Sequence, residues 1–341
     1  MIGLIARADS TGLGIQSKEF FTNIHCKALV IDFQNVGQPH MSHILEPDFT
    51  HFKNQEVFQW GHRHNMRGDI PRGTIERFLE GVDTLFCMET PYDYDIFDEC
   101  RVRGIKTILQ LNYEFLDFPN RHGIRPPDLF AAPSYWNWDL IPNPKVYLPF
   151  PTTIRPTRKA YNTFVHIAGR HAIQDRNGTQ TLLQALQFVR NQMKVIIHVQ
   201  HDTYFEPNRR SNVELIVDTR NKPDYRDNYD GGILVIPRKY GGLCLQINEA
   251  LSFGMPVITT DISPNNNWLP KEWLIPASHA GQIQAKRTID YFEGDPVALA
   301  AKMDEMCDPD TYLKESKRAE EIAQTISWDN LRSRYLEVLK P

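Results

Sequence analysis

Short apolar runs recur along the chain and are separated by segments in which apolar residues follow a helical spacing. In the first half, the helical spacing marks residues 16–24, 74–79 and 94–102. The apolar runs of this half, which predict strands, begin at Ile2, Ala28, Thr84, Thr107, Asp128 and Val146. Strands that alternate with helices are typical of parallel sheets with helical crossovers, so the pattern predicts an α/β protein.

The same alternation resumes after a proline-rich stretch at residues 149–159, which breaks the pattern and is the best candidate for a domain boundary. The strands predicted in this second half begin at Phe164, Val195, Glu214, Ile233, Pro256 and Trp273. Its helices are predicted over residues 179–192, 243–253, 296–307 and 328–339. The last helix follows Ser327, an expected N-cap residue.

The chain has 341 residues, more than one hydrophobic core usually organises, so two domains are expected. We place them at residues 1–150 and 151–326, followed by a helical segment at 327–341. The formal net charge of −4 excludes a global positive field that would concentrate the chain on nucleic acid or an anionic membrane. No secretory signal or membrane-spanning run is evident, so we expect a cytoplasmic location.

Metal-binding patterns are weak in this sequence. The five cysteines are widely spaced and form no C-x-x-C pair, so they are expected to be reduced and mostly buried. Residues 40–65 are rich in histidine, but their spacings match no standard ligand pattern, and a solvated loop is the favoured interpretation. We therefore assign no metal site and no cofactor.

The most informative stretch is PRKYGGLCLQINEALSFGMPVITTD, at residues 237–261. A predicted strand ends in a basic pair, Arg238 and Lys239, and Gly241 and Gly242 then lead into a helix. Glycines allow close approach of the backbone, and the N–H groups at a helix start favour an anion. The stretch therefore predicts a diphosphate site, to which we assign Arg238, Lys239, Tyr240, Gly241, Gly242 and Leu243. A glycine-rich turn before a capped helix is the alternative.

Glu249 lies about two turns further along the same helix. An ionised carboxylate only accepts hydrogen bonds, so Glu249 could accept both hydroxyls of a ribose. A surface glutamate without a ligand is the alternative.

A second basic cluster follows the first strand of the second half. The strand ends at Gly169 and Arg170, and a short loop carries Arg176 to the start of a helix near Thr179. Open α/β sheets bind ligands at the carboxyl ends of their strands, so the two arginines are candidates for phosphate contacts. Surface ion pairs are the alternative for both.

The first half also has polar strand ends. The first strand runs through Asp9 into a loop with Gly12 and Gly14, which is either a ligand loop or a simple tight turn. Glu89 follows the third predicted strand, and Asn112 and Glu114 follow the fourth. These side chains are candidates for binding or activating an acceptor hydroxyl, with surface helix caps as the alternative, and Glu89 is the one assigned to catalysis.

Residues 164–261 and the closing S-W-x-x-L-R-x-x-Y-L-E-V-L helix resemble the large family of retaining GT-B glycosyltransferases known from many bacteria and phages. The resemblance implies two Rossmann-like domains facing across a cleft, with the C-terminal helix packing back toward the first. It implies acceptor binding in the first domain and a nucleotide sugar in the second. Arg170 and Arg176 would hold the donor diphosphate, beside a glycine loop that corresponds to Gly12 and Gly14.

The family's E-x(7)-E pattern places its second glutamate on the ribose, and Glu249 matches it. The first glutamate, which contacts the transferred sugar, is replaced here by Gly241, so the sugar remains open. The resemblance also implies recognition of the base near Asp218 and Thr219.

The function expected from this resemblance is transfer of a hexosyl or pentosyl group from a nucleoside diphosphate sugar to an acceptor hydroxyl, with retention of configuration. Stabilisation of the departing diphosphate would be the main catalytic task, assigned to Arg170 and Arg176. No metal is implied: Asp93 to Asp95 matches D-x-D literally, but it follows a proline and begins a helix, so it is better explained as a helix cap.

Other activities stay open at this stage. The acceptor could be a glycan, a protein side chain, a small molecule or a hydroxylated DNA base. Residues 134–138 and the basic stretch at 155–159 hint at an aromatic, basic groove of the kind that binds nucleic acid, although exposed aromatic residues bind sugars equally well. A nucleotide-sugar epimerase and a non-catalytic nucleotide-sugar binder are the remaining alternatives.

Overall fold

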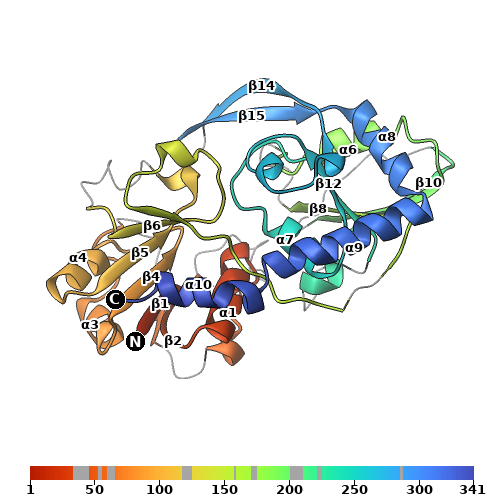
Figure 1. The fold of residues 1–341 in the computed structure, drawn as a ribbon. Coiled ribbons are helices and arrows are strands. Elements are labelled where there is room, and N and C mark those ends of the chain that lie inside the picture. The colour runs from red at the N-terminus through yellow and green to blue at the C-terminus, as the bar shows by residue number, and fades with distance from the viewer. Residues whose placement is uncertain are drawn as a thin grey trace. The chain divides into compact units, whose positions relative to one another are not determined.

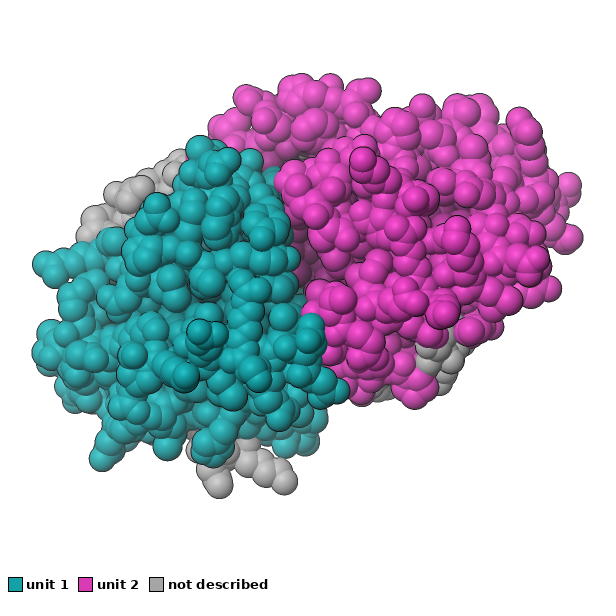
Figure 2. Space-filling view, viewed as in Figure 1, with its two compact units in different colours: residues 1–151, 328–341 teal, residues 152–327 magenta. Residues whose placement is uncertain are grey.

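A computed structural model describes residues 1–33, 46–52, 56–59, 66–116, 125–156, 159–169, 175–199, 210–220, 225–229, 231–284 and 287–341. The chain divides into two compact units, shown in different colours in Figure 2. Unit 1 comprises residues 1–151 together with 328–341, and unit 2 comprises residues 152–327. The division falls inside the proline-rich stretch that breaks the strand-helix alternation.

Unit 1 is built on a seven-stranded sheet with the order β3-β2-β1-β4-β5-β6-β7, in which all neighbouring strands are parallel. The strands are β1 (Ile2–Ala6), β2 (Cys26–Asp32), β3 (Glu56–Gln59), β4 (Thr84–Met88), β5 (Lys106–Gln110), β6 (Leu129–Ala132) and β7 (Lys145–Tyr147). The central strands are almost entirely apolar and buried, as expected for a parallel sheet covered on both faces.

Helices join these strands. They are α1 (Gly12–Asn23), α3 (Arg72–Leu79), α4 (Asp95–Val102) and the 3-10 turns η2 (Phe49–His51), η3 (Tyr113–Phe115) and η4 (Trp138–Leu140). The terminal helix α10 (Trp328–Val338) also belongs to this unit and lies beside α1 in Figure 1. Trp328 and Tyr335 of α10 pack edge-on against Phe20 of α1, and the indole N–H of Trp328 donates to Glu19 Oε2 at 3.1 Å.

Unit 2 has a six-stranded sheet with the order β10-β9-β8-β11-β12-β13, again parallel throughout. The strands are β8 (Thr163–Gly169), β9 (Met193–Val199), β10 (Val213–Asp218), β11 (Ile233–Ile236), β12 (Val257–Thr260) and β13 (Leu274–Ile275). The helical elements are α6 (Thr179–Ala185), α7 (Leu245–Ser252), α8 (Pro296–Met306), α9 (Pro309–Thr325) and the 3-10 turns η5 (Tyr225–Asn228), η6 (Asn265–Asn267) and η7 (Lys271–Trp273).

An antiparallel ribbon follows the sheet of unit 2. It consists of β14 (Ala277–Gln284) and β15 (Thr288–Gly294), which pair with each other and not with the main sheet (Figure 1). Its outer part is largely exposed, whereas Gly294 at its base packs against Thr260, Ile275 and Thr181. The ribbon is therefore anchored to unit 2 through its base.

The α/β class and the parallel sheets predicted from the sequence are confirmed, as is the return of the last helix to the first unit. The prediction omitted β3, the β14–β15 ribbon and α9. It also extended the helix at 179–192 too far, because α6 ends at Ala185. Beyond that residue the amides of Gln187 and Phe188 bond three residues back instead of four, which closes the helix with tight turns.

No helix among the described residues is long and apolar enough to cross a membrane. Most of the histidine-rich segment, including His40, His43, His62 and His64, lies outside the described residues.

Candidate functional site

The loop after β8 is shaped by glycine and asparagine. Gly169 ends the strand with a φ of +60°, and Asn177 Nδ2 donates to the carbonyl of Ile167 at 2.9 Å. Asn177 thereby joins the segment before α6 to the end of β8. Arg170, one of the predicted phosphate ligands, lies outside the described residues.

The same loop is pressed onto the segment that follows β11. Gly178 has a φ of +75°, and a Cβ atom placed there would lie 2.0 Å from the carbonyl oxygen of Pro237, so only glycine fits. The carbonyl of Arg176 accepts the amide of Lys239 at 2.9 Å. These two contacts bring Arg176 and the predicted basic pair of Arg238 and Lys239, far apart in sequence, into one site at the carboxyl ends of β8 and β11.

Arg238 is buried and organises the glycine turn at residues 240–244. Its Nε donates to the carbonyl of Tyr240 at 3.0 Å, and Nη1 donates to Asn177 Oδ1 at 3.3 Å. Further contacts reach Cys244 Sγ at 3.2 Å and the carbonyl of Leu243 at 3.4 Å. All four of these acceptors are neutral, so they satisfy the guanidinium's hydrogen bonds without cancelling its charge.

Arg176 and Arg238 converge at Gly241. A Cβ atom at Gly241 would lie 2.3 Å from Arg176 Nη2 and 2.6 Å from Arg238 Nη2. The guanidinium of Arg176 also lies 4.9 Å from the ring centre of Tyr240, which holds it by a cation–π contact. Gly241 has a φ of +119°, a conformation that favours glycine. The space from which a side chain at this position would extend is thus occupied by two positively charged groups.

Lys239 is held by carboxylates. Its Nζ lies 3.2 Å from Asp175 Oδ2 and 2.6 Å from Glu293 Oε1, at the base of the ribbon. Burial lowers the pKa of Lys239, but the bonds to Glu293 and Asp175 outweigh it and raise the pKa above its ordinary value. Asp175 also accepts the amides of Thr179 and Gln180 at the start of α6. Lys239 therefore links β11, α6 and the ribbon.

Helix α7 begins directly after the turn, with Cys244 as its N-cap residue, whose side chain accepts no hydrogen bond from the first amides of the helix. The predicted ribose ligand, Glu249, is buried in the middle of this helix, where Oε2 accepts the hydroxyl of Tyr229. Tyr229 in turn stacks on Phe253 with the ring centres 6.0 Å apart. The carboxylate of Glu249 is thus fixed in position by an aromatic neighbour.

The predicted base contacts lie at the end of β10, separated from β8 by β9 in the sheet. Asp218 is buried and binds Arg220 through two bonds of 2.8 and 3.0 Å, with His198 Nδ1 at 3.4 Å. The hydrogen bonds from Arg220 hold the pKa of Asp218 far below its usual range. Thr219 is exposed. Of the two, only Thr219 presents its side chain to solvent.

In unit 1, the loop after β1 is ordered by Asp9. Its carboxylate accepts the guanidinium of Arg7 and, at 3.1 Å, the amide of Thr11, and Thr11 caps α1. A Cβ atom at Gly14 would lie 1.9 Å from the carbonyl oxygen of Asp9, whereas one at Gly12 would meet nothing within 4 Å. Gly14 is therefore required by the turn, and Gly12 leaves open space.

The next strand ends of unit 1 also meet. Asn112 Nδ2 donates to Glu89 Oε1 at 3.0 Å, so the side chains after β4 and β5 form a pair. Glu89 has a φ of +61°, and its amide donates to the carbonyl of Gln110 at 2.9 Å. A non-glycine residue in the left-handed region is uncommon and is held here by the neighbouring strand. Glu114 lies in the following turn, η3.

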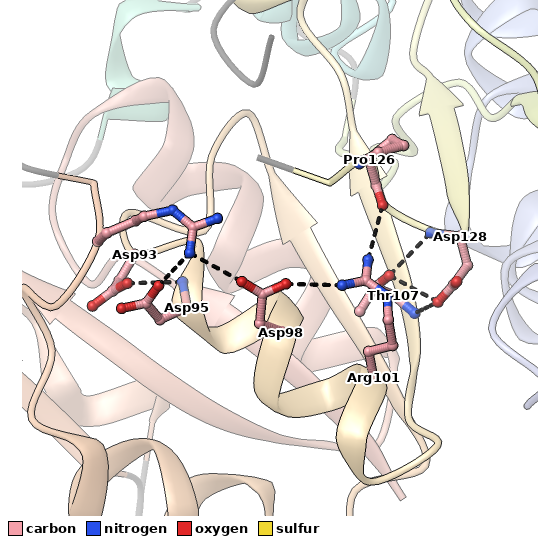
Figure 3. Close-up of polar contacts among 8 residues, drawn as sticks. Asp93, Asp95, Asp98, Arg101, Thr107, Pro126 and Asp128 are labelled. Carbon is pink, nitrogen blue, oxygen red and sulfur yellow. Dashed lines mark hydrogen bonds and ion pairs between the residues drawn. The ribbon is translucent and has the colours of Figure 1, made fainter. Parts of the chain in front are cut away.

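The carboxylates of the D-x-D sequence contact protein groups (Figure 3). Asp93 Oδ1 accepts the amide of Asp95, the first residue of α4, and Asp93 Oδ2 accepts the amide of Ile70. Asp95 and Asp98 both bind Arg67, at 2.7 and 3.0 Å. The carboxylates thus cap and brace α4. Within the described part of the chain, no group of three or more histidine, cysteine, aspartate or glutamate residues could hold a metal ion.

Several organising residues were not identified from the sequence: Asp175, Glu293, Tyr229 and His198. Asp175 carried a local signal, since it stands four residues before Thr179 at a helix start. Glu293 and Tyr229 reach the site from distant segments, so no local pattern could assign them.

Solved structures match nearly the whole chain. Sucrose-phosphate synthase from Thermosynechococcus elongatus aligns over 99% of this chain and 97% of its own, with a TM-score of 0.64 and 14% identity. Anabaena HepE, solved with UDP and glucose, aligns over 99% and 98%, with a TM-score of 0.65 and 11% identity. The lipopolysaccharide outer core galactosyltransferase WaaB aligns over 99% of both chains, with a TM-score of 0.59 and 12% identity.

No protein-family model matches the chain, and no curated protein matches its sequence. At identities of 11 to 14%, the structural matches report on the fold. They agree with the two parallel sheets and the returning helix described above. The chain therefore has the GT-B fold of the retaining glycosyltransferases that its glycine and arginine motifs resemble.

Proposed function

We propose that the chain is a glycosyltransferase that transfers a sugar from a nucleoside diphosphate sugar to an acceptor hydroxyl, with retention of configuration. The observation that carries the proposal is the convergence of Arg176 and Arg238 at Gly241. Two guanidinium groups held this close repel each other, and an anion placed between them would relieve the repulsion. A diphosphate has the charge and the multiple acceptors that such a pair binds.

The site has the elements needed to stabilise a leaving diphosphate. Negative charge grows on the diphosphate as the bond to the sugar breaks, and preorganised cations and amides stabilise it most in the transition state. Arg238 is fixed by the turn carbonyls and Arg176 by Tyr240, so neither has to be reorganised when charge develops. The start of α7, which immediately follows, would add its amide dipoles.

The likeness to HepE, which has been solved with UDP-glucose, favours a uridine diphosphate sugar as the donor. In this proposal residues 151–326 bind the donor, and Glu249 accepts the ribose hydroxyls while Thr219 lies toward the base. Arg170 would add a further phosphate contact. Lys239 lies beside the diphosphate but supports it indirectly, since it is engaged with Asp175 and Glu293.

Residues 1–150 bind the acceptor in this proposal, with the segment at 327–341 completing that unit. The Glu89–Asn112 pair would orient the acceptor hydroxyl, with Asp9 and Glu114 nearby on the same sheet edge. A carboxylate that accepts a hydrogen bond from the hydroxyl makes its oxygen a better nucleophile. The glycine loop at Gly12 and Gly14 would approach the donor phosphates.

A thermal-shift series tests the donor site. UDP, UDP-glucose, UDP-N-acetylglucosamine and GDP-mannose are each added to the chain, since a ligand that binds only the folded state raises the melting temperature. Stabilisation by a uridine diphosphate compound that is lost in Arg176→Met supports the proposal. Arg190→Met is the matched control, because Arg190 is exposed and precedes β9 at the opposite sheet edge. Equal stabilisation in both variants would remove the phosphate assignment.

Turnover separates the activities that share this fold. Release of UDP that depends on an added acceptor is the result expected of a transferase. Conversion of the donor sugar without any acceptor would identify an epimerase, and binding without turnover in every acceptor mixture would identify a binding module.

A further inference from the structure

Three aromatic side chains form a cluster on unit 1, which we call the Tyr135 platform: Tyr135, Trp138 and Tyr147. Tyr135 stacks on Tyr147 with the ring centres 4.2 Å apart and an interplanar angle of 22°. Trp138 meets Tyr135 edge-on at 5.7 Å. Tyr135 is 44% exposed. Trp138 and Tyr147 are half-buried, so Tyr135 is the ring that offers an apolar face with a polar hydroxyl at its rim.

The platform lies at the same edge of the sheet as the candidate acceptor residues. Tyr147 is the last residue of β7 and is aligned with Ala132, the last residue of β6. Because all strands of this sheet are parallel, these positions share the carboxyl edge with Glu89 and Asn112.

A buried aromatic pair connects the two places. Trp136, the residue after Tyr135, packs edge-on against Tyr113 with the ring centres 5.2 Å apart. Tyr113 stands between Asn112 and Glu114 in the chain. The contact between Trp136 and Tyr113 therefore joins the chain segment of the platform to that of Asn112.

The cations around the platform are occupied by the fold. Lys145 Nζ lies 4.7 Å from the ring centre of Trp138 and donates to the carbonyls of Trp138 and Ile141, at 2.8 and 3.1 Å. Arg334 donates to the carbonyl of Tyr147 and lies 5.8 Å from its ring centre. Both of these cations brace the aromatic rings, so neither Lys145 nor Arg334 is a loose charge of the kind that tracks a nucleic-acid backbone.

We propose that the Tyr135 platform binds a sugar ring of a carbohydrate acceptor and so makes glycans the acceptor class of this enzyme. The apolar C–H face of a pyranose covers an aromatic ring, while its hydroxyls reach the phenol groups at the rim. A second sugar of the same chain then reaches the Glu89–Asn112 pair. This inference rests on the proposed function for its role in catalysis, but binding at the platform does not need the donor.

Direct binding tests the platform without donor. Cellohexaose, maltohexaose and single-stranded oligothymidylate are titrated into the full chain by calorimetry. Tyr135→Ala is expected to weaken hexasaccharide binding at least tenfold, the loss of one aromatic anchor of about 1.4 kcal/mol. Tyr135→Phe, which keeps the ring, is expected to retain most of the affinity. Tyr161→Ala, at an exposed tyrosine of unit 2, is the matched control and should bind as the unmodified chain does.

The platform is supported if either hexasaccharide binds saturably and the affinity is kept in Tyr135→Phe and Tyr161→Ala but falls in Tyr135→Ala. The absence of hexasaccharide binding, equal binding by Tyr135→Ala, or binding of oligothymidylate alone would overturn it. Melting temperatures of the variants exclude unfolding as the cause. If the sugars bind as expected but no UDP-sugar is consumed, the transferase assignment fails and the platform stands. If donor is consumed but Tyr135→Ala has an unchanged acceptor KM, the platform fails alone.

Discussion

Lys239 and Glu293 form an ion pair, with Nζ 2.6 Å from Oε1, that joins the end of β11 to the base of the ribbon. The backbone repeats the connection, because the carbonyl of Lys239 accepts the amide of Phe292 at 3.0 Å. The shorter distance does not make the pair with Glu293 the stronger of the two ion pairs of Lys239. Glu293 is 44% exposed, whereas Asp175 is only 14% exposed, so solvent screens the first pair more.

Double-mutant cycles should therefore give unequal coupling energies for Lys239. With Lys239→Met and Asp175→Asn, we expect a coupling of about 1.5–3 kcal/mol in the free energy of unfolding, the range for hydrogen bonds to charged groups. With Lys239→Met and Glu293→Gln, we expect less than about 1 kcal/mol. Urea unfolding of the single and double variants provides the measurement. A larger coupling to Glu293 would contradict the screening argument.

Alanine substitutions should distinguish a position where the turn requires glycine, Gly14, from one where it does not, Gly12. Gly14→Ala brings a Cβ atom against the carbonyl oxygen of Asp9 and should destabilise unit 1 by about 1–3 kcal/mol, the cost of forcing the backbone to move. Gly12→Ala is the control, since a methyl group there meets nothing and alanine favours the helix. Thermal unfolding followed by circular dichroism reports both. Equal melting temperatures for the two variants would refute the close contact.

Gly241→Ala should weaken donor binding. Its methyl group would displace the guanidinium groups of Arg176 and Arg238, which are held by the turn. Under the proposed function we expect the donor KM to rise about tenfold or more, as for the loss of one charge-assisted contact. Initial rates at fixed acceptor and varied UDP-sugar measure the effect. An unchanged KM would mean that these two arginines do not contact the donor.

The ion pair of Asp218 should make the folding stability of the chain depend on pH. Hydrogen bonds from Arg220 lower the pKa of Asp218 in the folded state, so the carboxylate stabilises the fold above its unfolded pKa near 3.9. That contribution is lost as the pH falls through the folded pKa. Asp218→Asn should therefore melt below the unmodified chain at pH 7, and the two melting curves should converge on acidification. A gap that stays constant down to pH 2 would show that the ionised carboxylate contributes nothing.

Trp328→Ala should destabilise unit 1 by about 3–5 kcal/mol, the usual cost of removing a buried tryptophan. The indole packs against Phe20, Phe150 and Tyr335, and its loss leaves a cavity between α10 and the sheet. Leu336→Ala on the same helix is the control, because Leu336 is 44% exposed. The rate of proteolysis of unit 1 is measured for both variants, and Trp328→Ala should be cleaved faster. Equal rates would contradict the packing of Trp328.

The sequence predicts most strands of both sheets, because a parallel strand buried on both faces is a run of apolar residues. Strand β3 escaped prediction because EVFQ mixes exposed polar residues into a short edge strand. The β14–β15 ribbon escaped because its residues are stabilised mainly by each other and carry many polar side chains. Helix α9 is amphipathic, but the sequence pattern predicts only the helices on either side of it.

The candidate site can also be predicted from the sequence only in part. Arg176, Arg238 and Gly241 could be proposed from sequence, because glycines and cations at strand ends mark the edge where α/β sheets bind ligands. Their convergence depends on the contact of Gly178 with Pro237, which joins two segments far apart in the chain. The pairing of Lys239 with carboxylates from α6 and the ribbon likewise has no local signature.

The return of α10 to unit 1 has a consequence for biosynthesis. Residues 328–341 leave the ribosome only after all of unit 2 has been made, and until then Phe20 lacks Trp328 and Tyr335 as neighbours. Domains usually fold in the order in which they are synthesised. Here the unit that emerges first is completed last, because the contacts of Phe20 with Trp328 and Tyr335 can form only after unit 2 has been synthesised.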